Sequence, residues 1–418
     1  MWLAACNKPD HNTINSFRSK KLKGALKTIF KEIVLFLNAQ GVLDIEEVYV
    51  DGTKIEANAN KYSFVWKKTI QRNKQRIQER LEELWDYAES VSKEGMKRAK
   101  PVDFSKLTSE DVEEAINTIN RALKGKPIDS KKNQLKHANR CYVKNYRKYE
   151  EQEKILGDRN SYSKTDKDAT FMKMKEDSGS GKTPKPGYNL QLITNGQYVI
   201  DYGLYSNPTD TRTLIPQLEE FKKQYGFYPR ELTADSGYGS EENYAYLEQN
   251  NITGYVKYNY YDRELSKGNK AYKEFHQENL YYNSEGDYYV CPIGQKMYKK
   301  EVRKIKNKSG YVQELHIYEA QNCSGCPMRS LCHKGSGNRQ IKVNHRLKSY
   351  KRRARELLNS EKGRYHRSCR GVDVETVFGN IKHNKGFRRF SLRGKGKCLV
   401  EIGLVLLSHN IQKYIKVS

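Results

Sequence analysis

The stretch from Gly371 to Arg393 reads GVDVETVFGNIKHNKGFRRFSLR and carries the clearest pattern in the chain. Its apolar residues recur at i, i+3, i+4 and i+7, the spacing of one face of an amphipathic helix. Those residues are Val374, Val377, Phe378 and Ile381. The spacing therefore predicts a helix whose apolar face packs against the rest of the protein.

A second stripe, formed by Glu375, Gly379 and Lys382, runs beside the apolar face. Glycine within a helix costs about 1 kcal/mol relative to alanine, so Gly379 suggests that something bulky comes close here. Downstream, basic residues are mixed with aromatic ones, and an acid beside such a segment would repel a phosphate backbone. A bound divalent cation would remove that conflict. The plain structural alternative is an exposed glutamate with a lysine seven residues later.

The charge of the chain indicates a polyanionic partner. Its 418 residues include 77 Lys and Arg against 50 Asp and Glu, which gives a formal net charge of +27. Such an excess most often serves nucleic acid. The basic residues are interleaved with 31 tyrosines rather than collected in a tail, so they predict a folded binding surface and not a disordered arm.

No stretch approaches the roughly 18 uncharged apolar residues of a membrane span, and the start MWLAACNKPDHNTI has no signal-peptide pattern. We therefore expect no membrane partner and a cytoplasmic, nucleoid-associated protein. Met1 falls where a helical segment should already be under way, so we expect part of an N-terminal domain to be missing.

Two acids come directly after predicted strands and have glycine close behind them. One segment ends at Asp51-Gly52, and Glu231–Ala234 ends at Asp235-Ser236-Gly237. Ligands of open α/β sheets collect at the carboxyl ends of strands, and the glycines would let a large substrate approach. Each acid alone is more often a turn residue. Together with Glu375 they offer three hard oxygen ligands suited to Mg²⁺ or Mn²⁺.

Seven segments resemble the DDE-class transposases of bacterial insertion sequences, and they occur in that family's order over nearly the whole chain. They are KPDHNTINSFR (8–18), VDGTKIEANANKYSFVWKK (50–68), GYNLQLITN (187–195), SNPTDTRTLIPQLE (206–219), LTADSGYGSEENYAYLE (232–248), DVETVFGNIKHNKGFRRFSLRG (373–394) and SHNIQK (408–413). The last two are the most specific.

The resemblance implies a ribonuclease-H-like core in which Asp51, Asp235 and Glu375 hold two divalent ions, Mg²⁺ or Mn²⁺. Two such ions, about 3.5–4 Å apart, can activate an attacking oxygen and stabilise a leaving one. The implied activity is cleavage at the ends of a mobile element, then transfer of the 3′-OH into target DNA. The partners would be the terminal inverted repeats and the target DNA, and the active form a homo-oligomer.

Basic residues around the Glu375 helix would hold DNA phosphates near the cut, without reading sequence. The family pattern has a lysine seven residues after the glutamate, where Lys382 stands. It also has a tyrosine and an arginine upstream, and Tyr365, Arg367 and Arg370 lie there at other spacings. The expected DNA contacts are Lys382, Arg388, Arg389, Arg393, Arg370 and Lys385. The aromatic and basic runs Tyr142–Tyr149 and Tyr255–Tyr261 could stack on bases or simply pack.

The remaining pattern predicts an α/β fold, a mixed sheet flanked by helices, with two insertions. A hairpin turns at Asn195-Gly196, Thr209 or Asp210 caps a helix up to Tyr225, and Thr108–Asp111 forms a capping box. The predicted parts are a helical N-terminal remnant (1–43), the first catalytic strand (44–60), a helical insertion (61–175), the catalytic core (176–258), a β-rich insertion of short strands with cysteines (259–345) and the Glu375 and C-terminal helices (346–418).

Four of the eight cysteines suggest a structural zinc site. Cys291, Cys323, Cys326 and Cys332 have the spacing C-x31-C-x2-C-x5-C, and four thiolates form a common structural zinc shell. The alternative is four reduced thiols in a small β-rich insertion. The CxxC half favours zinc, whereas the long first gap is only compatible with it.

Two rival functions remain open at this point. A related metal-dependent nuclease would cut DNA without joining it. A truncated, non-catalytic copy would bind element ends and act as a repressor, even with its three acids intact.

Overall fold

The computed structural model describes residues 8–92, 96, 102–127, 131–174, 184–266 and 275–417. The first seven residues lie outside the described residues. The chain forms two compact units. The first comprises Met1–Ile55, Asn189–Phe390 and Gly396–Ser418, and the second comprises Glu56–Tyr188 and Ser391–Lys395.

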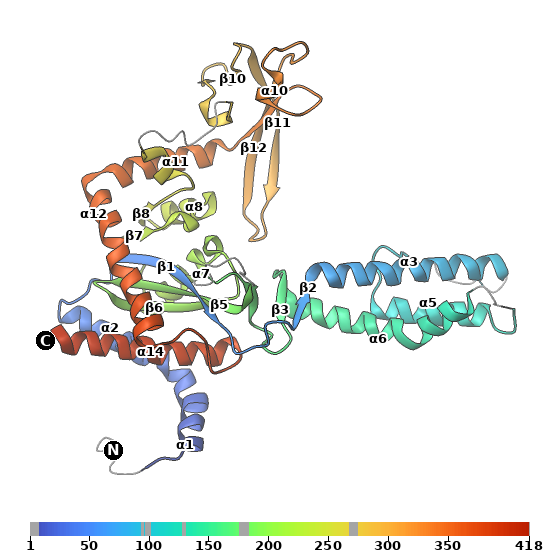
Figure 1. Cartoon of the computed structure of the whole chain (residues 1–418), viewed down its shortest axis with the longest axis horizontal. Coiled ribbons are helices and arrows are strands. Elements are labelled where there is room, and N and C mark those ends of the chain that lie inside the picture. Colours follow the sequence, from blue (N-terminus) through green and yellow to red (C-terminus); the bar gives the residue numbers. More distant parts are fainter. Residues whose placement is uncertain are drawn as a thin grey trace. The chain divides into compact units, whose positions relative to one another are not determined.

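A mixed sheet forms the centre of the first unit (Figure 1). Its strands are β1 (Glu47–Glu56), β5 (Lys185–Asn195), β6 (Tyr198–Tyr205), β7 (Glu231–Ala234) and β8 (Thr253–Val256). They run in the order β5-β1-β7-β8, and β6 also pairs with β5. The pairs β1–β7 and β7–β8 are parallel, whereas β5 and β6 form an antiparallel hairpin. The predicted mixed sheet is therefore confirmed.

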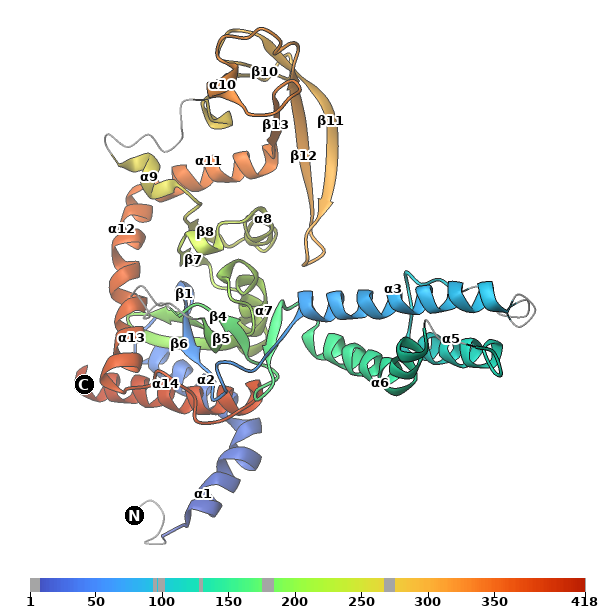
Figure 2. The same cartoon turned by 45° about the vertical axis from the view of Figure 1, so that its right-hand side comes forward.

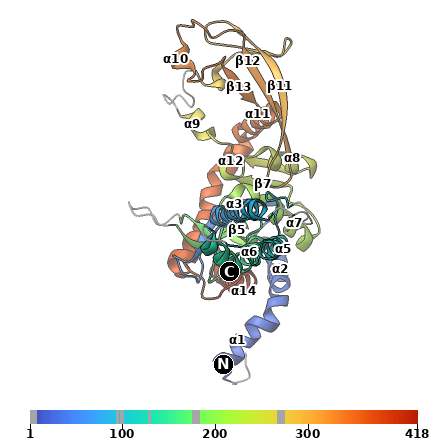
Figure 3. The ribbon, with the colours of Figure 1, turned by 90° about the vertical axis from the view of Figure 1, so that its right-hand side faces the viewer.

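Helices cover both sides of this sheet. They are α2 (Lys23–Ala39), α7 (Leu214–Tyr225), α8 (Glu241–Gln249), α11 (His345–Asn359), α12 (Glu361–Arg370) and α14 (Lys395–Val417). Figure 3 shows α7 and α8 on one side and α12 on the other. On α2, Phe30 packs against Tyr202 of β6 with ring centroids 5.0 Å apart. Before α2, the helical turns α1 (His11–Ser16) and η2 (Phe17–Leu22) bury no side chain.

The helix predicted from Gly371 onward continues α12 as a chain of short turns. These are the wider, π-helical η6 (Gly371–Glu375) and η7 (Asn380–Asn384), with α13 (Thr376–Gly379) between them. The predicted apolar face is buried along its whole length, which confirms the i, i+3, i+4, i+7 assignment. Single π turns inside helices are often found at functional sites.

The insertion before α11 is a second, antiparallel sheet (Figure 2). Its strands are β9 (Tyr282–Asn283), β10 (Tyr288–Val290), β11 (Lys296–Lys306), β12 (Val312–Ala320) and β13 (Gln340–Val343). The expectation of short strands was wrong for β11 and β12, because their many lysines and glutamates hide the strand pattern. The tip of this hairpin contacts α8, where the Tyr311 hydroxyl donates to Glu241 at 3.0 Å.

The second unit is built mainly from the helices α3 (Lys67–Val91), α5 (Ser109–Ala122) and α6 (Lys132–Leu156). They enclose their own core, which includes Leu81, Leu84 and Ile119. The predicted capping box is present, because Thr108 accepts from the Asp111 amide and the Asp111 carboxylate accepts from the Thr108 amide. Short strands complete the unit: β2 (Phe64–Trp66) pairs with β3 (Ser161–Ser163), and β4 (Thr170–Met172) pairs with the start of β5.

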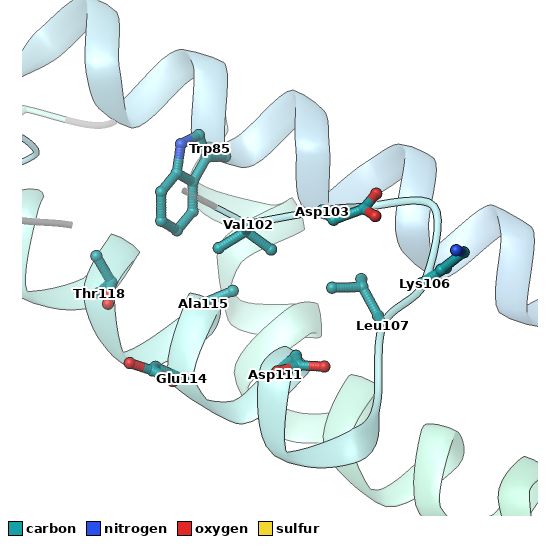
Figure 4. A pocket seen from close by; sticks show the side chains of 9 residues that line it. All are labelled: Trp85, Val102, Asp103, Lys106, Leu107, Asp111, Glu114, Ala115 and Thr118. Atoms are coloured by element: carbon teal, nitrogen blue, oxygen red, sulfur yellow. The ribbon is translucent and has the colours of Figure 1, made fainter. Parts of the chain in front are cut away.

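A recess of about 340 Å³ opens between α3 and α5 of this second unit (Figure 4). Its lining residues are Trp85, Val102, Asp103, Lys106, Leu107, Asp111, Glu114, Ala115 and Thr118. Its lining contains three acids and one lysine, so its net negative charge would repel a phosphate backbone. Among the helices that the structure describes, none has the length and apolar character needed to cross a membrane.

Candidate active site

Parallel pairing places Asp51 and Asp235 side by side, but only Asp235 follows the end of its strand, because β1 continues past Asp51 to Glu56 and the predicted strand end at Asp51 was wrong. The last registered pair of β1 and β7 is Val50 with Ala234, and Asp51 and Asp235 are the next residues on the two strands. The Asp51 side chain is buried and accepts from the Gly52 amide at 2.7 Å. The Asp235 side chain accepts from the Gly237 amide at 2.8 Å. Each carboxylate is therefore oriented by a backbone amide of its own segment, inside strand β1 for Asp51 and in the turn after β7 for Asp235.

Helix α12 is held along β1 by three successive side-chain pairs. One turn of helix separates the helix partners, about 6 Å for four residues. Two residues separate the strand partners, about 6.6 Å, so the two spacings nearly match. The pairs are Lys362 with Glu47, His366 with Tyr49 and Arg370 with Asp51, at 3.1, 3.1 and 3.2 Å. We call these three pairs the α12–β1 ladder.

The last rung of the ladder connects the third predicted acid to the site. Arg370 contacts Asp51 through one guanidinium nitrogen and lies 3.6 Å from the Glu375 carboxylate through another. The Glu375 side chain is 64% exposed, whereas the Asp51 side chain is 8% exposed. Glu375 thus meets Asp51 through a shared arginine, at a place that solvent can reach.

A fourth carboxylate, Asp210, lies in the same place and was missed from the sequence. It starts the short turn η3 (Asp210–Arg212) and accepts from the side-chain amides of Asn189 and Gln191 at 2.7 and 2.9 Å. An added Cβ on Gly52 would lie 2.6 Å from one Asp210 oxygen, and one on Gly237 would lie 3.5 Å from the other. Asp210 therefore lies over both Gly52 and Gly237.

Two expectations change because of Asp210. The side chain does not cap the following helix, and the residue before it, Thr209, makes no side-chain cap bond either. An acid just before a helix ordinarily predicts a cap, so the sequence held no signal for its position. The space over Gly52 is filled by Gln191 and Asp210, so this glycine serves packing within the chain rather than the approach of a substrate.

The pKa of the Tyr238 hydroxyl depends on the negative charges of these acids. Burial, and then the negative charges of Asp210, Asp51 and Asp235, raise the pKa of Tyr238 well above its ordinary value. The neutral hydroxyl donates to the side-chain oxygen of Gln191. The same amide group thus accepts from Tyr238 and donates to Asp210, which connects Tyr238 to Asp210 through Gln191.

The basic residues expected to contact DNA fall into four groups. Arg388 and Arg389 are exposed, and Arg370 faces the acids. Lys382 is 6% exposed and donates to the Lys54 carbonyl of β1 at 3.1 Å, so it faces the protein. Two others are held by neighbouring segments. Lys385 contacts Ser408 of α14, and Arg393, in the second unit, donates to the Asn58 carbonyl.

A different set of possible metal ligands lies at the other end of the ladder. Within the described ranges, the one group of three or more His, Cys, Asp or Glu side chains with ligand atoms within 4.8 Å of each other is Glu47, Glu231 and His366. The ammonium group of Lys362 already contacts both of these carboxylates. The cluster is therefore an ion-pair network that holds α12 on the sheet.

The four cysteines of the predicted zinc site lie in the antiparallel insertion without forming a ready ligand set. Cys291 and Cys323 pack in the same small core. The buried Arg339 donates to the Cys323 sulfur from its backbone and to the Cys332 sulfur from its guanidinium, at 3.4 and 2.9 Å. An arginine side chain thus contacts one of the sulfurs directly. The zinc site stays a prediction.

Comparison with known proteins gives one finding. Residues 290–415 match the family model described as a transposase DDE domain. The matched segment contains Arg370, Glu375 and the cysteines, whereas Asp51 and Asp235 precede it. Neither the curated proteins nor the solved structures that were compared with the chain gave a match.

Proposed function

We propose, starting from the transposase DDE domain that the chain carries over residues 290–415, that the protein cleaves DNA at the ends of a mobile element and joins the freed 3′-OH to target DNA. The observation that supports this proposal most directly is that Arg370 contacts both Asp51 and Glu375. Asp51 lies beside Asp235 in the register of β1 with β7. This arrangement supports a single site built from three acids of distant segments.

The donor set fits divalent cations. The guanidinium of Arg370 lies between two carboxylates, and a positive group at that point stands in for the charge that a metal ion would supply. Asp51, Asp235 and Glu375 would hold the ions, Mg²⁺ or Mn²⁺, with oxygen donors only. When bound, such ions lower the pKa of an attacking water and stabilise the charge on the leaving oxygen.

The chain's own residues would orient the DNA around that centre. The exposed Arg388 and Arg389 would bind phosphates on either side of the cut. The surface at Gly379 is open, since an added Cβ there would meet nothing within 4 Å, so a bulky backbone can come close to Glu375. Lys382 would act indirectly, because its contact with the Lys54 carbonyl holds the Glu375 helix against β1.

The test uses the full chain, labelled duplexes that carry the element end, and Mg²⁺ or Mn²⁺. We expect cleavage by the unchanged protein, and joining when a precut 3′-OH end is supplied. Asp51→Asn, Asp235→Asn and Glu375→Gln should each abolish cleavage while leaving duplex binding largely intact. Glu314→Gln, an exposed glutamate paired with Lys304 on the antiparallel insertion, is the matched control and should cleave normally.

Three results would redirect the proposal. Cleavage that survives Asp235→Asn would remove the assignment of the acids. Cleavage without any joining of precut ends would favour a nuclease instead of a transposase. Binding of the ends without cleavage by the unchanged chain would favour a repressor.

A further inference from the structure

A recess of about 420 Å³ opens directly beside the proposed catalytic edge. Ser236, the residue after Asp235, forms part of its wall, and three of the other lining residues are tyrosines. The other main lining residues are Tyr258, Asn259, Tyr260, Tyr261 and Arg263. The volume lies within the range of about 300–1,000 Å³ that small-molecule pockets have.

Tyr260 is held in this recess by a disfavoured backbone conformation. Its φ is +74°, in the left-handed region that bulky side chains rarely adopt. Glycine would take this conformation without strain. The ring is nevertheless 47% exposed, and the Arg263 guanidinium lies 5.2 Å from its centroid. Strained backbone that presents a half-exposed side chain is typical of a functional position.

The other two tyrosines, Tyr258 and Tyr261, pack together beneath the recess, and an arginine lies behind one of them. Tyr258 and Tyr261 are buried, with ring centroids 5.4 Å apart and planes at 81°. The Arg367 guanidinium lies 5.5 Å from the Tyr261 ring. The acid at the rim, Asp262, is paired with Lys257 at 2.9 Å, so it does not leave an uncompensated negative charge. The recess therefore offers the exposed ring of Tyr260, the Arg263 guanidinium and short polar side chains.

We propose that this recess binds one unpaired nucleobase of the DNA strand next to the cleaved phosphate. The inference rests on the proposed function, since that function brings DNA to Asp235. Every base has an aromatic face, so stacking on Tyr260 and Arg263 needs no particular sequence. Asn259 and Ser236 would hydrogen-bond to the edge of the base. A phosphate alone would not use the aromatic walls.

The experiment compares two DNA lesions at the same position. A mismatch leaves the base present but unpaired, whereas an abasic site removes it, and both lower the cost of opening the duplex. Each lesion is placed in turn at the nucleotides on either side of the cut, and the Kd is measured without divalent metal so that nothing is cleaved. Stacking on one aromatic ring contributes about 1–3 kcal/mol. At one position the mismatch should therefore bind about 5- to 150-fold more tightly than the abasic duplex.

Two variants make the test specific. Tyr260→Gly should bring the ratio of the two Kd values close to one while leaving the thermal stability equal or higher, because it removes both the ring and the backbone strain. Tyr260→Phe should keep the ratio. A ratio near one for the unchanged protein at every position, or an unaltered ratio in Tyr260→Gly, would overturn the proposal. If the unchanged protein showed no metal-dependent cleavage, that result would instead count against the proposed function.

Discussion

Replacing Arg370 by glutamine tests whether this side chain supplies the positive charge between the acids. A charged hydrogen bond to a carboxylate contributes about 1.5–3 kcal/mol, and the Arg370–Asp51 pair is mostly buried. The pair with Glu375 adds about 0–1 kcal/mol, because that carboxylate is exposed. Arg370→Gln should therefore lower the local opening free energy by about 2–3 kcal/mol when no divalent metal is present.

Native-state hydrogen exchange of the β1 and α12 amides measures this change directly. A loss of about 2–3 kcal/mol corresponds to exchange that is about 30- to 150-fold faster. Adding Mn²⁺ should reverse most of the effect, and Arg370→Gln should bind Mn²⁺ more tightly than the unchanged protein in the absence of DNA, because the competing cation is gone. Arg388→Gln removes an exposed guanidinium and is the control, with neither effect expected. Unchanged exchange together with unchanged Mn²⁺ affinity in Arg370→Gln would refute the reasoning.

Further predictions concern acid, packing and metal. Burial lowers the pKa of His409 below its usual value, so below about pH 6.5 the unfolded chain takes up a proton on this residue before the folded chain does. The free energy of unfolding should therefore fall as the pH drops from 7 to 5, by at most about 1.4 kcal/mol per pH unit for this group. His409→Gln should flatten that slope in urea titrations. Gly52→Ala places a Cβ 2.1 Å from the Gln191 amide nitrogen and should cost about 1–3 kcal/mol in denaturant unfolding together with most of the cleavage. Its control, Gly379→Ala, should gain up to about 1 kcal/mol yet weaken DNA binding. Metal analysis of purified protein should find one zinc per chain, and Cys326→Ser should remove it; zinc-free protein of normal stability would contradict the four-thiolate prediction.

The parts of the site that follow from local pattern could be predicted from the sequence. The buried face of the Glu375 helix follows from a spacing of three and four residues, and Asp235 follows a strand that its own composition indicates. The strand around Asp51 was also indicated by composition, but it continues to Glu56 instead of ending at the acid. A strand end determines where a carboxylate lies, because parallel strands align their carboxyl ends at one edge of the sheet. These inferences need no knowledge of distant contacts.

The contacts between distant segments could not be predicted in this way. Arg370 and Asp51 are 319 positions apart, and the rung between them depends on how a helix lies along a strand. Asp210 is oriented by Asn189 and Gln191 of β5, whereas its sequence neighbours indicate only a cap. The burial of Lys382 likewise depends on a backbone oxygen of β1. Each case is decided by tertiary packing, which overrides local propensity.

The α12–β1 ladder limits its own length. Successive rungs advance about 6.0 Å on the helix and about 6.6 Å on the strand, so the partners drift apart by about 0.6 Å at every step. After three rungs the accumulated offset is about 1.2 Å, and a fourth pair would be about 1.8 Å out of register. The helix changes its winding at Gly371, directly after the third rung. Glu375 lies beyond the point where the helix and strand spacings still match, so it is not held against the strand. Its side chain faces outward, where an incoming duplex can reach it.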